Sequence, residues 1–347
     1  MTIIFRSNAN STVGFGHLNR CRALAYALKL RGQSCIMVGP QKKYKNNKDE
    51  SIFKDWIPID NWVSTKQDSE MLIKIAKKYH QSYLILDDYR INENYQINLR
   101  KKGLRWLQFD HKENSRPIWA DIILNPMPGI YKDELENIVQ NKKAEFLLGP
   151  DYAILRPEFV KVKKNDHIKR DKTILVTFGA GNDYGGIIFV LSTLIPLVPS
   201  NFKFVVVSGL NNPNNKKINE WIQNNGKNKV DLQIEPKDLV NIFLSCDIAV
   251  TAGGTTTYEL DSCGLQFIII STTRNQIEQS KAWANTGKAM YIGEIENVSK
   301  KSLISSFNSM INNKNILNRD GNLNSYEGLY KVADIIIKKK LINNHGN

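Results

Sequence analysis

The sequence is poor in the residues that build disulfide frameworks and metal sites. Its 347 residues include only four cysteines and five histidines. Cys21, Cys35, Cys246 and Cys263 form no C-x-x-C pair, and each stands in an apolar or helical segment. This pattern argues against a structural zinc site and against a disulfide framework, and it is typical of a reducing compartment.

Long apolar runs are also missing. The N-terminus lacks the charged region and apolar core of a signal peptide. The most apolar stretch, residues 187–198, is interrupted by Pro196 and is shorter than the roughly 20 residues that a membrane helix needs. We therefore expect a cytoplasmic protein with no stable membrane insertion.

Acidic residues are outnumbered by basic ones, 34 against 48, which gives a net charge of +14. A basic surface favours anionic partners such as nucleic acid, anionic lipid or a phosphorylated metabolite. The basic residues are spread among many asparagines, and the sequence carries no helix-turn-helix, zinc-finger or RNA-recognition signature. We therefore expect no nucleic-acid partner, and a solvated basic surface is the simplest interpretation.

Short apolar segments alternate with longer amphipathic ones in the first half of the chain. A helix is predicted over residues 16–30, where apolar side chains recur at helical spacing, and another over 69–79. Residues 41–50 are predicted to form a polar loop with no core signal. The predicted strands are residues 3–5, 35–39, 83–86, 104–109, 122–124 and 146–148.

The same rhythm restarts after a charged stretch, residues 156–172, that is typical of a linker. A last amphipathic helix is predicted from about 326 to 339. Strands that alternate with helices at this spacing predict parallel βαβ units, and therefore two doubly wound α/β domains, 1–155 and 172–325, with a C-terminal helix and tail over 326–347. Two such domains are expected to face a cleft. The predicted strands are residues 174–178, 204–207, 232–234, 248–251, 267–270 and 291–292.

The loop after the first strand holds the strongest candidate for catalysis. It ends in Gly14-Phe15-Gly16-His17 and leads into a helix. Its glycines allow a tight turn beside a ligand. His17 is suited to take a proton near neutral pH, and the positive end of a helix favours its neutral form. The alternative is a structural hydrogen bond at a helix start. The loop is not the dinucleotide fingerprint, because Asn19 replaces its third glycine.

Polar residues end three further strands of the first half. Asp87, Asp88 and Tyr89 follow one strand, Asp110 ends the next, and Asn125 ends a third. Taken singly, each is explained as a helix cap or turn residue. Together they predict polar groups at the carboxyl edge of a sheet, where ligands of open α/β folds bind.

Two glycine-rich loops lead from strand to helix in the second half. Residues 178–183, with Gly179, Gly181 and Asn182, are typical of a phosphate-binding loop, and residues 251–259 add hydroxyl groups to the same layout. Glu259 is predicted to accept both ribose hydroxyls. The alternative is a capping box formed by Thr256 and Glu259. Residues 274–276 are expected to present amides to a sugar, or to form an ordinary loop.

These motifs together resemble a known family, the UDP-2,4-diacetamido-2,4,6-trideoxy-β-L-altropyranose hydrolases of pseudaminic acid biosynthesis. The match runs in order from residue 1 to about 290. It is carried by Phe5-Arg6-Ser7, Gly14–Arg20, Leu86–Tyr89, Phe109-Asp110, Leu124-Asn125, Leu148–Phe159 and Asn275-Gln276.

The resemblance implies a GT-B-like fold and a metal-independent hydrolase, without a cofactor, that releases UDP from a UDP-sugar. It implies that His17 is the general base on water, that Tyr89 and Asn275 hold the sugar, and that Glu259 and its loop hold UDP. Attack by water opposite the leaving group would invert the anomeric carbon. Asp87, Asp88 or Asp110 would orient His17 or the water.

The predicted site has three groups of residues and no metal. The catalytic group is His17, Asp87 and Asp88. The substrate-binding group is Arg6, Gly14, Gly16, Arg20, Tyr89, Asp110, Asn125, Tyr152, Asn275 and Gln276. The UDP-binding group is Gly179, Gly181, Asn182, Ile234, Ala252, Gly253, Gly254, Thr255, Thr256 and Glu259.

Two other functions fit the same loops. A GT-B glycosyltransferase would use the same UDP-sugar donor with a sugar or lipid acceptor in place of water. A non-catalytic nucleotide-sugar binding protein would hold UDP without turnover. Release of free sugar in the absence of any acceptor distinguishes a hydrolase from both.

Overall fold

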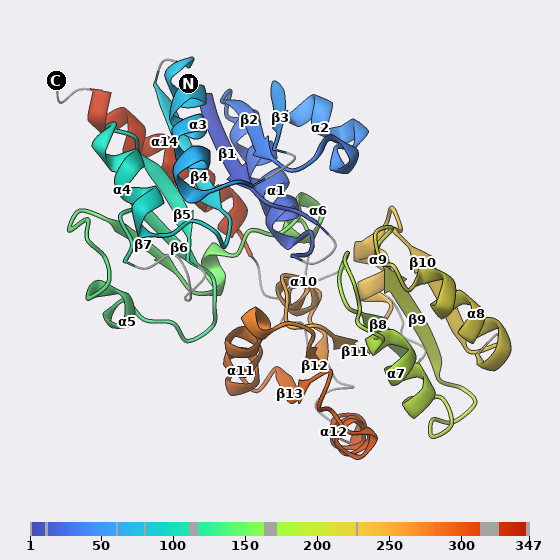
Figure 1. Ribbon diagram of the computed structural model, residues 1–347. Helices are drawn as coiled ribbons and strands as arrows, with labels where there is room; N and C mark the ends of the chain where they lie inside the picture. Colours follow the sequence, from blue (N-terminus) through green and yellow to red (C-terminus); the bar gives the residue numbers. More distant parts are fainter. Residues whose placement is uncertain are drawn as a thin grey trace. The chain divides into compact units, whose positions relative to one another are not determined.

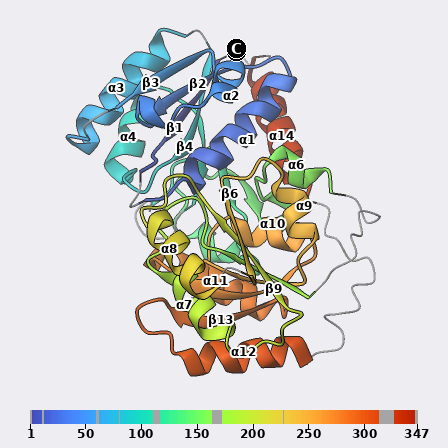
Figure 2. The ribbon, with the colours of Figure 1, turned by 90° about the vertical axis from the view of Figure 1, so that its right-hand side faces the viewer.

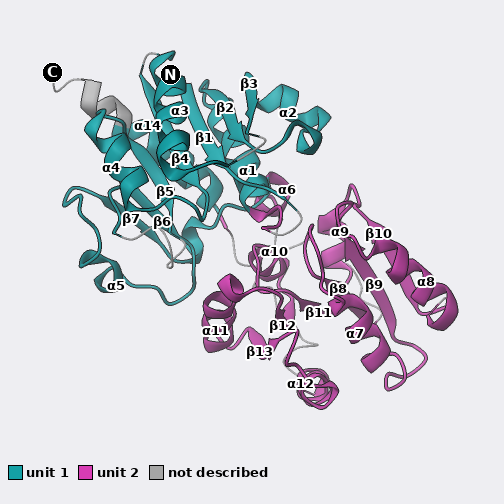
Figure 3. Cartoon of the chain, in the orientation of Figure 1, with its two compact units in different colours: residues 1–10, 17–156, 327–347 teal, residues 11–16, 157–326 magenta. Residues whose placement is uncertain are grey.

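The computed structural model describes residues 2–10, 13–59, 62–79, 81–110, 117–162, 172–226, 228–312 and 326–344, with 340–344 described by their backbone alone. The chain forms two compact units (Figure 3). Unit 1 holds residues 1–10, 17–156 and 327–347, and unit 2 holds residues 11–16 and 157–326. Each unit contains one parallel sheet with helices packed on it (Figure 1). The predicted pair of doubly wound α/β domains is confirmed.

Unit 1 contains a seven-stranded sheet in the order β3-β2-β1-β4-β5-β6-β7. Its neighbouring strands pair in parallel, with Arg6 of β1 in register with Leu86 of β4. The strand order reverses between β1 and β4, and the carboxyl ends of strands at such a reversal are where open α/β sheets bind ligands. The strands are β1 (Thr2–Ser7), β2 (Ser34–Gly39), β3 (Asp55–Pro58), β4 (Ser82–Asp87), β5 (Trp106–Phe109), β6 (Ile122–Asn125) and β7 (Glu145–Leu148).

The helices of unit 1 cover both faces of this sheet. The first, α1, spans Gly16–Leu30 as predicted, and its buried residues include Leu18, Leu24 and Leu28. A core of buried side chains from β1, β2, β4, β5, α3 and α4 fills the other face. The remaining elements are η1 (Lys42–Tyr44), α2 (Asn47–Ile52), α3 (Thr65–Lys77), α4 (Glu93–Lys101), α5 (Asp133–Glu136), η2 (Pro150–Tyr152) and α14 (Gly328–Asn344).

The prediction of a polar loop over residues 41–50 is wrong. This segment forms η1 and the start of α2, whose N-cap Asn46 makes a capping box with Asp49. The carboxylate of Asp49 is buried and accepts hydrogen bonds from Arg22 of α1 at 2.8 and 2.7 Å. Strand β3, which follows, was also not predicted. A long-range ion pair holds this polar segment on the unit, and local hydrophobicity gives no sign of it.

The C-terminal helix α14 packs on unit 1. Figure 2 shows it beside α1, and Arg31 at the end of α1 pairs with Asp334 at 2.5 Å. Gly328 begins α14 against the backbone of η2. A Cβ at this position would lie 2.5 Å from the carbonyl oxygen of Ala153, so the close approach requires glycine.

Unit 2 contains a six-stranded parallel sheet in the order β10-β9-β8-β11-β12-β13, which reverses between β8 and β11. Its buried core joins the strands to α7, α8 and α12. The strands are β8 (Thr173–Thr177), β9 (Lys203–Ser208), β10 (Val230–Ile234), β11 (Ile248–Thr251), β12 (Gln266–Ser271) and β13 (Ala289–Glu294). The helices are α6 (Pro157–Val160), α7 (Gly186–Leu194), α8 (Asn215–Asn225), α9 (Leu239–Leu244), α10 (Thr256–Ser262), η3 (Arg274–Gln276), α11 (Ile277–Asn285) and α12 (Lys300–Asn312).

The predicted linker, 156–172, therefore begins with a short helix, α6. Its residues 163–171 lie outside the described residues.

Gly39, at the end of β2, packs closely against the end of β1, and its replacement tests this packing. Its φ is +124°, and an added Cβ would lie 2.1 Å from the carbonyl oxygen of Ser7 on β1. We expect Gly39→Ala to destabilise the protein by at least about 3 kcal/mol, measured by urea unfolding, because the strain of positive φ adds to a backbone clash. Gly32→Ala is the control, with φ +73° and open space around the new Cβ; it should cost only about 1–2 kcal/mol. Equal losses would contradict the clash.

Candidate functional site

His17 and Asp87 lie together at the strand-order reversal of unit 1. His17 is the second residue of α1, and Asp87 is the last of β4. Nδ1 of His17 is 2.6 Å from Oδ1 of Asp87 and 3.1 Å from the Asp87 carbonyl oxygen. Both side chains are buried. A proton on Nδ1 that is donated to this carboxylate leaves Nε2 as the basic nitrogen of the ring.

Arg20, one turn further along α1, neutralises the same carboxylate. Its Nε and Nη2 each lie 2.5 Å from an oxygen of Asp87, a bidentate geometry that fixes the carboxylate plane. Burial disfavours the charged guanidinium, but the Asp87 charge outweighs it and raises the pKa of Arg20. The guanidinium also stacks on Phe109 at 4.3 Å. His17 therefore faces a carboxylate whose charge is already compensated.

Cys21 completes the surroundings of Asp87, with Sγ 3.7 Å from Oδ2. Burial and the nearby carboxylate hold the pKa of this thiol well above its usual range. Cys21 is therefore a neutral packing residue with a weak donor and is unsuited to act as a nucleophile.

Asp88 points to the opposite face of the sheet from Asp87. It accepts bonds from Arg90 at 2.8 and 2.6 Å, and its Oδ2 is 3.0 Å from Nη1 of Arg6. Burial would raise the pKa of Asp88, but Arg90 and Arg6 together lower it. The sequence left open whether Asp87, Asp88 or Asp110 assists His17, and the structure places Asp87 in contact with its Nδ1.

Arg6, which the sequence analysis assigned to substrate binding, lies in the interior of unit 1. Its side chain is fully buried and pairs with Asp68 of α3 at 2.9 and 2.8 Å, as well as with Asp88. The hydroxyl of Tyr95 also donates to Asp68, at 2.7 Å. Through these ion pairs the buried Arg6 joins β1, α3 and the loop after β4. Asp68 was not predicted, because its partners lie far away in the sequence.

The other predicted residues of unit 1 surround this carboxyl edge. The Tyr89 ring packs edge-on against His17, with centroids 4.5 Å apart. Asn125 donates to Asp110 at 3.0 Å, and both are buried, so the ends of β5 and β6 are joined. Tyr152, at the end of η2, is partly exposed. The structure thus brings His17 into contact with Asp87 and Tyr89, and Arg20 into contact with the same Asp87 carboxylate.

The glycines before His17 lie in the short stretch, 11–16, that groups with unit 2. Gly14 has a φ of +85°, which fits the predicted tight turn, and Gly16 begins α1.

In unit 2 the loop 178–185 is held by side-chain amides. Asp183 is buried and accepts from the backbone N–H of Ile187, at 3.1 Å, in the first turn of α7. Asn214 donates to Asp183 at 2.6 Å and to Asn182 at 3.1 Å. The predicted Asn182 is thus part of a brace between the loops after β8 and β9. Gly179 and Gly181 are partly exposed in the same loop.

The loop after β11 is braced by two glutamines. Oε1 of Gln276 accepts from the Gly253 N–H at 3.2 Å and the Thr272 N–H at 3.0 Å. Gln279, which was not predicted, donates to the carbonyls of Gly253 and Gly254, each at 2.9 Å. The only feature of the sequence that could have indicated this role is the position of Gln279, three residues and so about one helical turn after Gln276. The Gly253 amide and the Gln276 side chain therefore hold each other.

Gly253 is required by close packing. A Cβ there would lie 2.1 Å from the hydroxyl oxygen of Ser280. The neighbouring Ala252 is buried, while Gly254, Thr255 and Thr256 are partly exposed. The backbone amides of these last three stand at the start of α10.

Glu259 does not complete a capping box with Thr256. The N-cap of α10 is Thr255, whose side chain makes no capping hydrogen bond, and Thr256 is already inside the helix. Glu259 is buried in the first turn of α10. Asn275 is exposed in η3, and Ile234 is 42% exposed at the end of β10.

Within the described part of the chain, no group of three or more His, Cys, Asp or Glu side chains is arranged to hold a metal ion. Among the same residues, none of the helices combines the length and apolar character needed to cross a bilayer.

Comparison with known proteins finds relatives that match most of the chain. The UDP-2,4-diacetamido-2,4,6-trideoxy-β-L-altropyranose hydrolase of Campylobacter jejuni is 24% identical over 286 residues, which cover 82% of this chain and 96% of that protein. The predicted resemblance to this family is confirmed. The spore coat polysaccharide biosynthesis protein SpsG of Bacillus subtilis is 26% identical over 301 residues, 84% of this chain and 83% of SpsG. No family model matches the chain.

The fold is that of GT-B proteins. The crystal structure of MurG from Acinetobacter baumannii matches 97% of this chain and 100% of its own, with a TM-score of 0.65 and 12% sequence identity. The GT-B-like fold expected from the resemblance is therefore confirmed.

The lowered pKa of Asp88 predicts a stability that depends on pH. A carboxyl group whose pKa is lower in the folded than in the unfolded protein stabilises above about pH 4, the unfolded value, and this contribution is lost as the pH falls through the folded value. We expect Asp88→Asn to cost about 3 kcal/mol at pH 7, because it breaks a buried ion pair, and the difference from the wild type to shrink below pH 4. Urea unfolding of both proteins at pH 7 and at pH 3 measures this difference in the free energy of unfolding.

The control is Asp133→Asn, which changes an exposed carboxylate on α5. It should shift the unfolding midpoint little at either pH. A penalty for Asp88→Asn that is the same at pH 3 and pH 7 would show that Arg6 and Arg90 do not hold Asp88 through its charge.

Proposed function

We propose that this protein hydrolyses a UDP-linked 2,4-diacetamido-2,4,6-trideoxy sugar to the free sugar and UDP, as an enzyme of pseudaminic acid or related nonulosonic acid biosynthesis. The observation that carries the proposal is the 2.6 Å contact between His17 Nδ1 and the Asp87 carboxylate at the strand-order reversal of unit 1. The name of the Campylobacter jejuni relative supports the substrate class.

In the proposed reaction, Nε2 of His17 accepts a proton from water as the water oxygen bonds to the anomeric carbon. The bond from that carbon to the UDP oxygen breaks, and UDP leaves with its electron pair. Attack opposite the leaving group inverts the anomeric configuration. The imidazolium formed is stabilised by Asp87 and then returns its proton to solvent.

The roles of the other residues follow from their contacts. Arg20 fixes the carboxylate plane of Asp87, and Tyr89 packs against the imidazole and supports the sugar together with Asn275. Asp110 and Asn125 present buried polar groups to the substrate at the ends of β5 and β6.

Unit 2 is proposed to bind UDP. The Gly253 amide is already bonded to Gln276, so the amides of Gly254, Thr255 and Thr256 are the donors at α10 that we assign to the diphosphate. Gly179, Gly181 and Asn182 supply the second loop. Glu259 accepts the ribose hydroxyls, while Ala252 and Ile234 flank the nucleoside.

Replacement of His17 tests the base. We expect His17→Asn and His17→Ala to lower kcat by about 10²–10⁴-fold, because the water loses its proton acceptor. Real-time proton NMR of a UDP-diacetamido sugar, without acceptor, would follow the anomeric configuration of the product. UDP affinity measured by calorimetry should stay within about threefold. An unchanged kcat would exclude His17 as the base, and absence of free sugar with the wild type would exclude hydrolysis of that substrate.

Replacement of the two aspartates separates their roles. We expect Asp87→Asn to lower kcat by about 10²-fold or more, because the amide no longer fixes the proton on Nδ1 of His17. Asp88→Asn, on the other face of the sheet, should cost at least tenfold less. Long-range ¹⁵N NMR of the imidazole should show the tautomer change in Asp87→Asn alone. Equal losses of kcat with unchanged tautomers would assign the effect of both residues to stability.

A further inference from the structure

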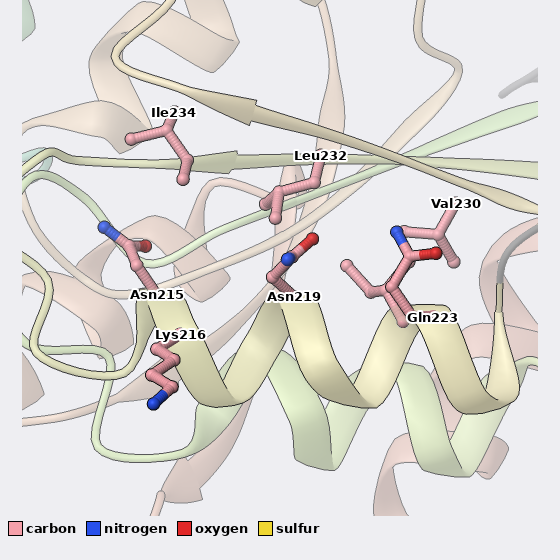
Figure 4. Close-up of a pocket in the computed structure, with 8 residues that line it drawn as sticks. Asn215, Lys216, Asn219, Gln223, Val230, Leu232 and Ile234 are labelled. Atoms are coloured by element: carbon pink, nitrogen blue, oxygen red, sulfur yellow. The ribbon is translucent and has the colours of Figure 1, made fainter.

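Strand β10 is an edge of the unit 2 sheet. It pairs with β9 and stands last in the strand order of the described residues. Beside it lies a hollow of about 590 Å³ between β10 and α8 (Figure 4), floored by Val230, Leu232 and Ile234. A second hollow lies between β10 and α9. Unprotected edge strands offer unpaired backbone groups to other chains.

The hydrogen bonds to β9 determine which backbone groups face outward. Phe204 N donates to Lys229 O, and Glu235 N donates to Ser208 O, each at 2.8 Å. In a parallel pair the residues that bond to a given neighbour alternate along the strand. Lys229, Asp231, Gln233 and Glu235 therefore bond to β9, and the even-numbered residues direct their N–H and C=O groups away from it.

One of these outward groups is already bonded within the chain. Val230 N donates to Gly226 O at 3.0 Å. The groups that β10 presents are then the C=O of Val230, the N–H and C=O of Leu232, and the N–H and C=O of Ile234.

We propose that β10 pairs in antiparallel fashion with β10 of a second copy of this chain, with the two-fold axis at Leu232. Leu232 then lies opposite its own copy, and each donates its N–H to the other's C=O. The N–H of Ile234 donates to the C=O of Val230 in the second copy. The N–H of Val230 takes no part, because it already donates to Gly226 O within its own chain. Under this one symmetry the N–H and C=O of Leu232, the N–H of Ile234 and the C=O of Val230 pair between the copies, and the C=O of Ile234 therefore stays open to solvent.

The side chains obey the same symmetry. Rotation about Leu232 brings Val230 opposite Ile234, so apolar residues face each other across the paired strands. It brings Asp231 opposite Gln233, whose amide already donates to Asp231 within the chain at 3.0 and 2.8 Å. Asp231 therefore avoids its own copy.

The charged residues that flank the strand add to the match. The same rotation brings Lys229 and Glu235, the residues that flank β10, to the same end of the paired strands, so that Lys229 can exchange its 3.4 Å contact with the Val198 carbonyl oxygen for the carboxylate of Glu235 in the second copy. Cross-strand pairs of opposite charge stabilise an antiparallel ladder, and like charges weaken it. The residues on the two sides of Leu232 complement each other. A two-fold symmetric dimer explains this pattern, because each side of the strand then meets the other side in the second copy, whereas pairing with an unrelated protein does not require it.

Helix α8 continues the pattern above the sheet. Its Asn215, Asn219 and Gln223 line the hollow in one stripe (Figure 4), and a two-fold axis near Asn219 brings Asn215 toward Gln223 of the second copy. Amides both donate and accept, so a stripe of amides is complementary to itself.

The oligomeric state of the full chain tests the proposal without any substrate, so its outcome is independent of the proposed hydrolase activity. We expect analytical ultracentrifugation to show a reversible dimer of about 79 kDa, twice the 39.6 kDa of the chain. Leu232→Lys places two like charges on the axis and should raise the dimer dissociation constant at least about tenfold. Val63→Lys, at a 71% exposed site in unit 1, is the matched control and should leave it unchanged.

Reversal of the charges at Lys229 and Glu235 tests the register of the two strands more directly than Leu232→Lys does. Lys229→Glu and Glu235→Lys should each raise the dissociation constant about tenfold, and the double variant should restore it to within about threefold of the wild type. Circular dichroism and thermal melting confirm that each variant is folded. A wild type that stays monomeric up to 100 μM, or a dimer that Leu232→Lys and the single reversals leave intact, would overturn the proposal.

Discussion

The placement of one carboxylate, that of Asp87, is the constraint on which the site in unit 1 depends. It stands at the end of β4, where the strand order reverses, and it contacts His17, Arg20 and Cys21 of α1. Because Arg20 compensates its charge, the carboxylate can orient the imidazole through Nδ1 without an unpaired buried charge. The helix and the strand are thereby fixed to each other at the residues that we assign to the chemistry.

The adjacent residue, Asp88, fixes the same strand end from the opposite face of the sheet. Successive residues of a strand end point to opposite faces, so Asp88 enters the α3 side, where Arg6 and Arg90 hold it. Arg6 in turn pairs with Asp68 of α3. Two consecutive aspartates thus have separate tasks: one faces the imidazole, and the other anchors the loop that carries Tyr89.

Unit 2 uses the same principle with neutral groups. Gln276, Gln279 and Asn214 hold the glycine-rich loops through their side-chain amides. Loops that are braced by their own side chains lose less conformational freedom when a ligand binds. The GT-B-like fold by itself does not select a reaction, since one fold supports many activities. In our proposal the imidazole of unit 1 makes the difference, because it supplies a base for water.

The sequence by itself determined the alternation of strands and helices, the extent of α1 and the polar strand ends, because burial in parallel sheets leaves apolar runs and helical periodicity that are local signals. It also placed His17 and the aspartates at one edge. Tertiary structure decided which aspartate meets His17, why Arg6 is buried and why residues 47–52 are helical. Each of these depends on a partner far away in the sequence, such as Arg22 for Asp49 and Asp68 for Arg6. A pair of charges leaves no periodic trace in the chain, and only the folded topology brings its members within reach.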